Sequence, residues 1–135
     1  MANNPMSVFD IAGRAMSAQL VRLNATASNM ANAGNVTGSE ATAYRAIKPV
    51  FRSVTEKPGV STVRVEQVVT SDAKPNKRHD PNHPLADANG DVFEAAVDSS
   101  AELVEMIESS RMYQNNVQVL QTAKSLMLDT VRMGK

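Results

Sequence analysis

The sequence predicts a mainly α-helical protein. Long N- and C-terminal helices form a coiled-coil-like pair, with a small β-hairpin and loop insertion between them. Three observations indicate this fold. Apolar residues recur every three or four positions at both ends of the chain, the middle holds two runs rich in β-branched residues, and a Pro-Gly turn separates these runs. We expect a discontinuous helical assembly domain, residues 1–35 and 100–135, and a hairpin and extended loop region in residues 36–99.

The first predicted helix spans residues 7–33, with Ser7 resembling a capping residue at its start and Gly34 a plausible stop. Its many alanines keep it slim, so that neighbouring elements can approach closely. The apolar stripe of this helix consists of Phe9, Ala12, Met16, Leu20, Leu23, Ala27 and Met30.

A polar line follows the same helix, because Asn24, Ser28 and Asn32 are spaced four residues apart, with Asn29 and Asn35 adjacent. One interpretation is a helix that frays toward a polar loop, since Asn is a poor helix former. The other is that these amides form lateral hydrogen bonds to other helices and fix their register, as buried polar residues do in coiled coils.

The second predicted helix spans residues 100–133, with Ser99 as the N-cap of a capping box that ends at Glu102. At 1.5 Å per residue it is about 50 Å long, too long to bury its stripe inside a chain of this size. It therefore needs partners, first the N-terminal helix and then other subunits. Its predicted seam alternates in steps of three and four, and comprises Leu103, Met106, Ser110, Tyr113, Val117, Leu120, Lys124, Met127 and Val131.

The middle of the chain predicts two strands, residues 46–54 and 60–70, joined by a turn at residues 57–59. Pro49 places the first strand at a sheet edge. Residues 71–91 contain three prolines and many Asp and Asn residues. We expect a long loop there, either mobile or ordered only when bound.

Composition excludes several classes of function. The net charge is zero, so the whole chain does not favour nucleic acid or anionic membranes, and the absence of cysteine excludes disulfides and thiolate chemistry. Neither a signal peptide nor a membrane-spanning run is visible. Residues 81–110 carry seven acidic residues and no Lys or Arg, which indicates either a patch that meets a basic patch of another copy or a solvated acidic face.

The best candidate for chemistry is a cluster of His79, His83 and Asp87, whose side chains are of the kind that binds divalent ions. Pro81 between the histidines excludes helical ligation, and the following residues lack the order of an EF-hand loop. We therefore expect no catalytic residue, no metal site and no cofactor. A small metal-dependent enzyme that uses these three residues remains the alternative.

Three segments resemble a known family. Residues 17–33 (SAQLVRLNATASNMANA) resemble the N-terminal signature of bacterial flagellar rod and hook proteins, and residues 110–128 (SRMYQNNVQVLQTAKSLML) resemble their C-terminal motif. Residues 82–90 (NHPLADANG) and the short middle are similar to the proximal-rod branch of this family. The chain departs from the usual pattern in residues 36–45, which lack the compact turn, and at Asp91, where an aromatic residue is usual.

The resemblance implies a non-enzymatic structural subunit of the proximal rod of the flagellar basal body. Such subunits are exported unfolded by the flagellar type III apparatus without a cleaved signal. They polymerise through their terminal helices into an axial tube that crosses the periplasm and transmits torque. The resemblance also implies that the termini are disordered in the monomer. The alternative within the assembly class is a non-flagellar coiled-coil protein or type III secretion component.

The implied partners are copies of the chain, other flagellar rod proteins, the hook–basal-body junction protein FliE and the export apparatus, with neither nucleic acid nor direct lipid insertion. The residues expected at the assembly interface are Phe9, Ala12, Met16, Leu20, Leu23, Asn24, Ser28, Asn29, Met30, Asn32, Leu103, Met106, Tyr113, Gln114, Asn115, Val117, Leu120, Lys124, Met127 and Val131.

Overall fold

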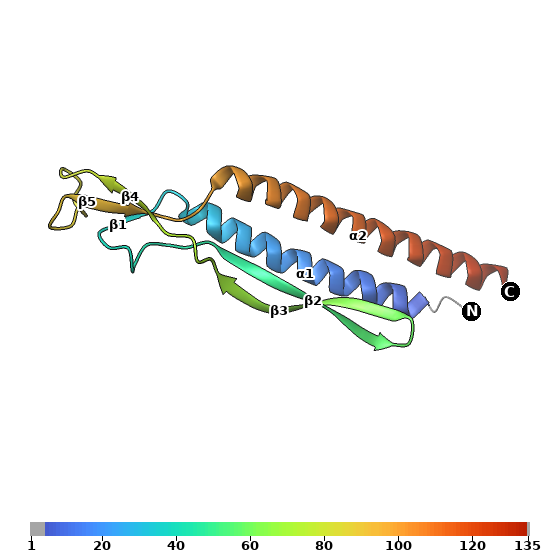
Figure 1. Ribbon diagram of the computed structural model, residues 1–135. Coiled ribbons are helices and arrows are strands. Elements are labelled where there is room, and N and C mark those ends of the chain that lie inside the picture. The colour runs from blue at the N-terminus through green and yellow to red at the C-terminus, as the bar shows by residue number, and fades with distance from the viewer. Residues whose placement is uncertain (1–4, 135) are drawn as a thin grey trace.

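The computed structural model describes residues 5–134 and contains two long antiparallel helices and two small sheets (Figure 1). This confirms a mainly α fold with a β insertion. The elements are α1 (Pro5–Asn32), β1 (Val36–Thr37), β2 (Ile47–Lys57), β3 (Val60–Thr70), β4 (Asn76–His79), β5 (Asp91–Glu94) and α2 (Ser99–Met133). Ser7, the expected capping residue, lies inside α1, and its side chain is outside the described part of the structure.

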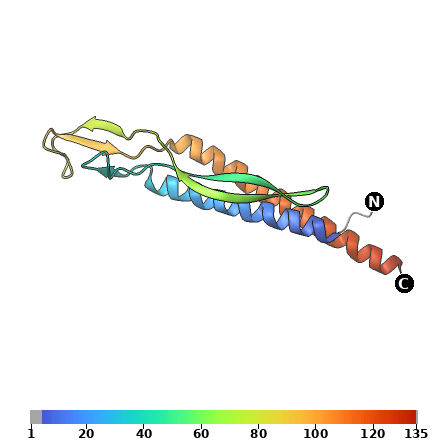
Figure 2. The same cartoon turned by 60° about the horizontal axis from the view of Figure 1, so that its bottom comes forward.

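Helix α1 is the middle layer of an elongated molecule. It contacts α2 on one side and the β2–β3 hairpin on another, as Figures 1 and 2 show. Both described ends of the chain lie at the same end of the molecule, where α2 projects beyond α1, and the three-stranded sheet lies at the opposite end. No helix in residues 5–134 combines the length and apolarity needed to cross a bilayer.

The core is made of small side chains. Its buried apolar residues are Ala12, Ala18, Ala25, Ala43, Ala46, Val92 and Ala95. Alanines on α1 let the helix lie close to both of its neighbours, as its composition predicted, but they bury little apolar area per residue. Much of the larger apolar surface of the helices is consequently left exposed.

The predicted hairpin is confirmed. Strands β2 and β3 pair antiparallel from Ile47 opposite Thr70 to Lys57 opposite Val60. The turn contains Gly59, whose φ of 79° lies in the left-handed region that favours glycine. The first strand extends three residues beyond its predicted end, because Thr55 pairs with Ser61 and Lys57 pairs with Val60, with an irregularity at Glu56 between them.

The long loop predicted at residues 71–91 is interrupted by strands that the prediction missed. This segment contains β4 and the first residue of β5, and these strands form a three-stranded sheet with β1 in the order β1-β5-β4. Val92 of β5 is fully buried at the centre of this sheet. Strands of two to four residues are too short to show an alternating pattern, so the prolines and Asp residues dominated the prediction.

The predicted N-cap of α2 was also wrong by one residue. Asp98, not Ser99, is the cap, and its Oδ1 accepts hydrogen bonds from the N–H groups of Ser100 (2.9 Å) and Ala101 (3.1 Å). A carboxylate at this position satisfies two free donors and also interacts favourably with the positive end of the helix dipole.

Candidate assembly surface and its internal support

Asn29 lies where three segments of the chain meet. It is 1% exposed, and its Nδ2 donates to the carbonyl of Ile47 (2.9 Å) and to Oε2 of Glu102 (3.0 Å). Its Oδ1 accepts from the N–H of Ile47 (2.8 Å) and from the hydroxyl of Tyr44 (3.0 Å). One amide thus joins α1, the start of β2 and the start of α2, with its oxygen and both of its donors satisfied.

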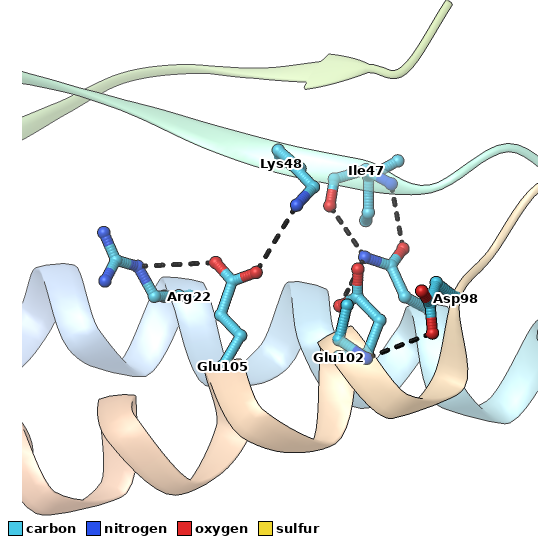
Figure 3. A network of polar contacts seen from close by, with 8 residues as sticks. Arg22, Ile47, Lys48, Asp98, Glu102 and Glu105 are labelled. Carbon is cyan, nitrogen blue, oxygen red and sulfur yellow. Dashed lines mark hydrogen bonds and ion pairs between the residues drawn. The ribbon is translucent and has the colours of Figure 1, made fainter. Parts of the chain in front are cut away.

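A second polar contact lies farther along α2. Glu105 faces Arg22 of α1 at 3.8 Å and Lys48 of β2 at 3.4 Å, and Figure 3 shows this bridge beside Glu102 and Asp98. The Arg22 guanidinium also lies 4.8 Å from the centre of the Phe51 ring. The charge of Glu105 is thereby balanced inside the subunit.

The predicted polar line on α1 does not form one surface. Asn24 is exposed, whereas the hydroxyl of Ser28 lies 3.2 Å from that of Tyr44. Asn32 donates to the carbonyl of Ser28 within the helix, and Asn35 donates to Oδ1 of Asn32. The end of α1 is therefore stabilised by local amide contacts, and Asn29 supports the subunit from inside.

The face of α2 that meets α1 differs from the predicted seam. Its buried residues are Glu102 and Ser109, seven positions apart, while Leu103 is 48% exposed. The half-buried members of the predicted seam are Met106, Ser110, Tyr113, Val117 and Leu120, and its exposed members are Leu103, Lys124, Met127 and Val131. Regular coiled-coil pairing is not confirmed, because the residues packed most tightly on α1 are small or polar.

The other residues expected at the assembly interface are distributed between surface and interior. On α1, Ala12 is buried, Leu20 and Asn24 are exposed, and Phe9, Met16, Leu23, Ser28, Met30 and Asn32 are half-buried. On α2, Gln114 and Asn115 are exposed. Sequence reasoning missed Tyr44, Ile47, Glu102 and Ser109 as contact residues. Two signals pointed to Tyr44. The chain contains only two tyrosines, and Tyr44 lies two residues before the predicted strand 46–54.

Apolar side chains cover much of the free surface of α2. The large exposed ones are Leu103, Val104, Ile107, Met112, Val119, Leu126, Met127, Leu128, Val131 and Met133. Val8 and the second half of α2 also line an open groove with a volume of about 870 Å³ and mainly apolar walls. Apolar surface of this extent on a small chain is typical of an interaction site.

The candidate cluster of His79, His83 and Asp87 builds a turn instead. Oδ1 of Asp87 accepts from the N–H groups of Asn89 and Asp91, and Nδ1 of His83 lies 3.1 Å from the N–H of Leu85. Within residues 5–134, no group of three His, Cys, Asp or Glu side chains is placed to hold a metal ion.

The buried Asp91 carboxylate joins two side chains of β4. Lys77 Nζ lies 2.6 Å from Oδ2 and His79 Nδ1 lies 2.9 Å from Oδ1. The hydrogen bond from Lys77, followed by that from His79, holds the pKa of Asp91 below its ordinary value, and Asp91 raises the pKa of Lys77. These groups connect two strands, which gives them a structural role.

Two family models match the parts of the chain that contain the two helices. A family model described as "Flagella basal body rod protein" matches residues 9–38, and one described as "Flagellar basal body rod FlgEFG protein C-terminal" matches residues 94–133. These ranges include the segments of α1 and α2 that carry the sequence resemblance.

Relatives that match almost the whole chain decide which family it belongs to. The flagellar basal-body rod protein FlgC of Yersinia enterocolitica is 49% identical over 132 residues, which cover 96% of this chain and 98% of the relative. The FlgC protein of Salmonella typhimurium is 46% identical over the same shares. The FlgC of Buchnera aphidicola from Schizaphis graminum is 37% identical, again over 96% and 98% of the two chains.

The chain belongs to the FlgC family of flagellar basal-body rod proteins. As a member of the FlgC family it is a structural protein of the flagellar basal body and not an enzyme. Membership sets aside both alternatives raised by the sequence, the metal-dependent enzyme and the non-flagellar assembly protein. It also gives the exposed apolar surface of α2 a context, since a rod is built of many packed subunits.

Proposed function

We propose that this chain is a subunit of the proximal rod that polymerises through the exposed apolar surface of its terminal helices, with residues 1–35 and 100–135 as the assembly region. One observation carries the proposal. Leu126, Met127 and Leu128 are consecutive on α2, yet their exposed fractions are 62%, 43% and 48%. Since successive helix residues point about 100° apart, this part of α2 presents apolar side chains over more than half of its circumference.

A helix with apolar side chains on several sides needs several neighbours. Helix α1 covers one side of α2, so at least one further helix has to cover the others in a stable assembly. Met112, Val119, Leu126 and Met133 are all exposed and recur every seven residues, the spacing at which a partner helix packs in a coiled coil. This second seam favours packing between subunits in a tubular array.

The exposed members of the expected interface form the second part of the proposal. We propose that Leu20 and Asn24 on α1, and Leu103, Gln114, Asn115, Lys124, Met127 and Val131 on α2, contact neighbouring subunits directly. The half-buried members, together with Ala12 and Asn29, would support this surface from within. Neighbours are copies of the chain and other rod proteins, with FliE at the base.

The route to this position follows from the same proposal. The subunit would be exported unfolded by the flagellar type III apparatus, without a cleaved signal, and would polymerise at the growing tip of the rod, which crosses the periplasm. A chain without cysteine suits this route, because no thiol can be oxidised on the way.

A paired substitution tests the proposal. Leu126→Glu places a charge on the exposed apolar surface, whereas Gln121→Glu places the same charge at an exposed polar position of the same helix. In a strain that lacks its own copy of the protein, we expect Leu126→Glu to abolish swimming and rod assembly and Gln121→Glu to preserve both. Export of each variant and its circular dichroism spectrum as a purified monomer serve as controls. Full motility with Leu126→Glu would contradict the proposal.

A further inference from the structure

The turn of residues 87–90 contains the only Asn-Gly pair in the sequence, Asn89-Gly90. Asparagine followed by glycine is prone to deamidation in an unfolded chain, because glycine has no side chain that keeps its backbone nitrogen away from the asparagine side chain. In this reaction the Gly90 nitrogen loses its proton to a base and attacks Cγ of Asn89. The new N–Cγ bond forms, the Cγ–Nδ2 bond breaks, and the amide leaves as ammonia after taking a proton from water. A water molecule then opens the succinimide ring, which gives aspartate or isoaspartate.

The structure holds the attacking nitrogen in place. The N–H of Gly90 donates to the carbonyl of Asp87 at 3.0 Å. Oδ1 of Asp87 accepts from the N–H groups of Asn89 (2.8 Å) and Asp91 (2.9 Å), and the N–H of Asp87 donates to the carbonyl of Asp91 (2.9 Å). Attack on Asn89 therefore requires the turn to open, because the Gly90 nitrogen has to leave its acceptor and approach Cγ.

Gly90 is also fixed by contacts outside the turn. Its carbonyl accepts from the N–H of Asp80 at 2.9 Å, and its φ of 77° lies in the left-handed region that favours glycine. A Cβ at this position would lie 3.0 Å from Cγ of Pro81 and 3.1 Å from Cε1 of His79. The turn therefore requires glycine at residue 90. It uses only the backbone of Asn89, which is exposed and whose side chain forms no hydrogen bond among the described residues.

We propose that Asn89 is a deamidation site that is reactive in the unfolded chain and is closed by the turn in the folded subunit. The turn creates the reactive pair, since it requires glycine after Asn89, and its hydrogen bonds then protect that pair. A chain that reacts before it folds cannot rebuild the turn, because isoaspartate lengthens the main chain by one atom and puts the hydrogen bonds of residues 87–91 out of register. This inference concerns the turn alone and does not depend on how subunits pack.

Mass spectrometry of the peptide that contains Asn89 tests the proposal, because deamidation changes its mass. Isolated basal bodies and the purified chain in guanidinium chloride are incubated at the same slightly alkaline pH and the same temperature. We expect Asn89 in the basal bodies to react at least about tenfold more slowly, because the reaction has to wait for local opening of the turn. Asn89→Ser should abolish the mass change in the denatured chain. Equal rates in the two samples, or a mass change that persists in Asn89→Ser, would overturn the proposal.

A matched pair of variants tests the turn itself. Asp87→Ala removes the acceptor for two N–H groups, and Asp72→Ala makes the same change at an exposed position outside the turn. In basal bodies we expect Asp87→Ala to raise the rate at Asn89 at least about threefold and Asp72→Ala to leave it unchanged. Equal rates in the two variants would refute protection by the turn. If Asp87→Ala subunits do not enter the rod, the comparison of assembled and denatured wild-type chain decides the proposal.

Discussion

The side-chain amide of Asn29 pairs with the backbone of Ile47 as a neighbouring strand would, donating to its carbonyl at 2.9 Å and accepting from its N–H at 2.8 Å. A helix thereby satisfies both backbone groups at the first residue of β2, where an edge strand would otherwise present them unpaired. The same amide reaches Glu102, so the start of the hairpin and the start of α2 have a common support.

The hydroxyl of Tyr44 completes this network, and its removal should be measurable. Tyr44→Phe deletes the donor to Oδ1 of Asn29 without creating a large cavity. We expect a loss of about 1 kcal/mol in the free energy of unfolding, the usual contribution of one partly buried hydrogen bond. The chain offers a matched control, Tyr113→Phe, since the hydroxyl of Tyr113 forms no hydrogen bond among the described residues. Urea unfolding of both variants makes the comparison, and equal losses would argue against a special role for Tyr44.

The identity of the α2 cap gives a second prediction. Asp98→Ala removes the acceptor for two N–H groups and should destabilise the protein by about 1 kcal/mol. Ser99→Ala, one residue later, should have almost no effect. Thermal unfolding followed by circular dichroism checks both variants. The opposite ranking would restore Ser99 as the cap.

The contact between Lys77, His79 and Asp91 predicts how stability depends on pH. The pKa of Asp91 is lowered from 3.8, so its contribution is complete above that value and is lost as the pH falls through the lowered pKa. The pKa of Lys77 is raised from 10.5, so its contribution is complete below that value and is lost as the pH rises through the raised pKa.

Asp91→Asn measures this contribution directly. The variant should be less stable than the wild type at neutral pH, and the difference between them should shrink as the pH falls through the lowered pKa of Asp91, where the carboxyl becomes neutral. A stability difference that persists unchanged at low pH would show that the carboxylate charge is irrelevant.

The two glycines after α1 allow a packing prediction. A Cβ added at Gly38 would lie 2.7 Å from the carbonyl oxygen of Leu85, whereas one added at Gly34 would meet nothing within 4 Å. Gly38→Ala should therefore cost about 1–3 kcal/mol, because backbone has to shift. Gly34→Ala should be neutral or slightly stabilising, because it restricts the unfolded chain. Melting temperatures of the two variants test the close approach of residues 38 and 85.

Elements with long patterns were predictable from the sequence. Both helices, the hairpin and its Pro58-Gly59 turn followed from periodicity and from β-branched residues. The second sheet was not, because its strands are short and Val92 is the one fully buried apolar residue among them. Its order depends on Asp87 and Asp91, whose residue type is equally typical of an open loop.

The candidate surface was predictable only in part. The predicted seam on α2 was drawn from all of its apolar residues, but α1 covers only some of these. The most deeply buried residues of α2 are Glu102 and Ser109. The periodicity of apolar residues indicates every helix surface that becomes buried, whether inside one subunit or between subunits. It therefore cannot distinguish these two kinds of contact. The site of Asn29 was visible in the polar line on α1, but its partners at residues 44–47 and 102 are set by tertiary structure.

The placement of the three-stranded sheet has a practical consequence for imaging. Both described chain ends, and with them the C-terminal end of α2, lie at one end of the molecule, and the turn of residues 80–90 lies at the other (Figure 1). In the proposed assembly, a fluorescent or epitope tag on either terminus would crowd the helices that contact other subunits. A short tag inserted within residues 82–84, away from the Asp87 turn, would sit far from them and would allow the protein to be followed in working flagella.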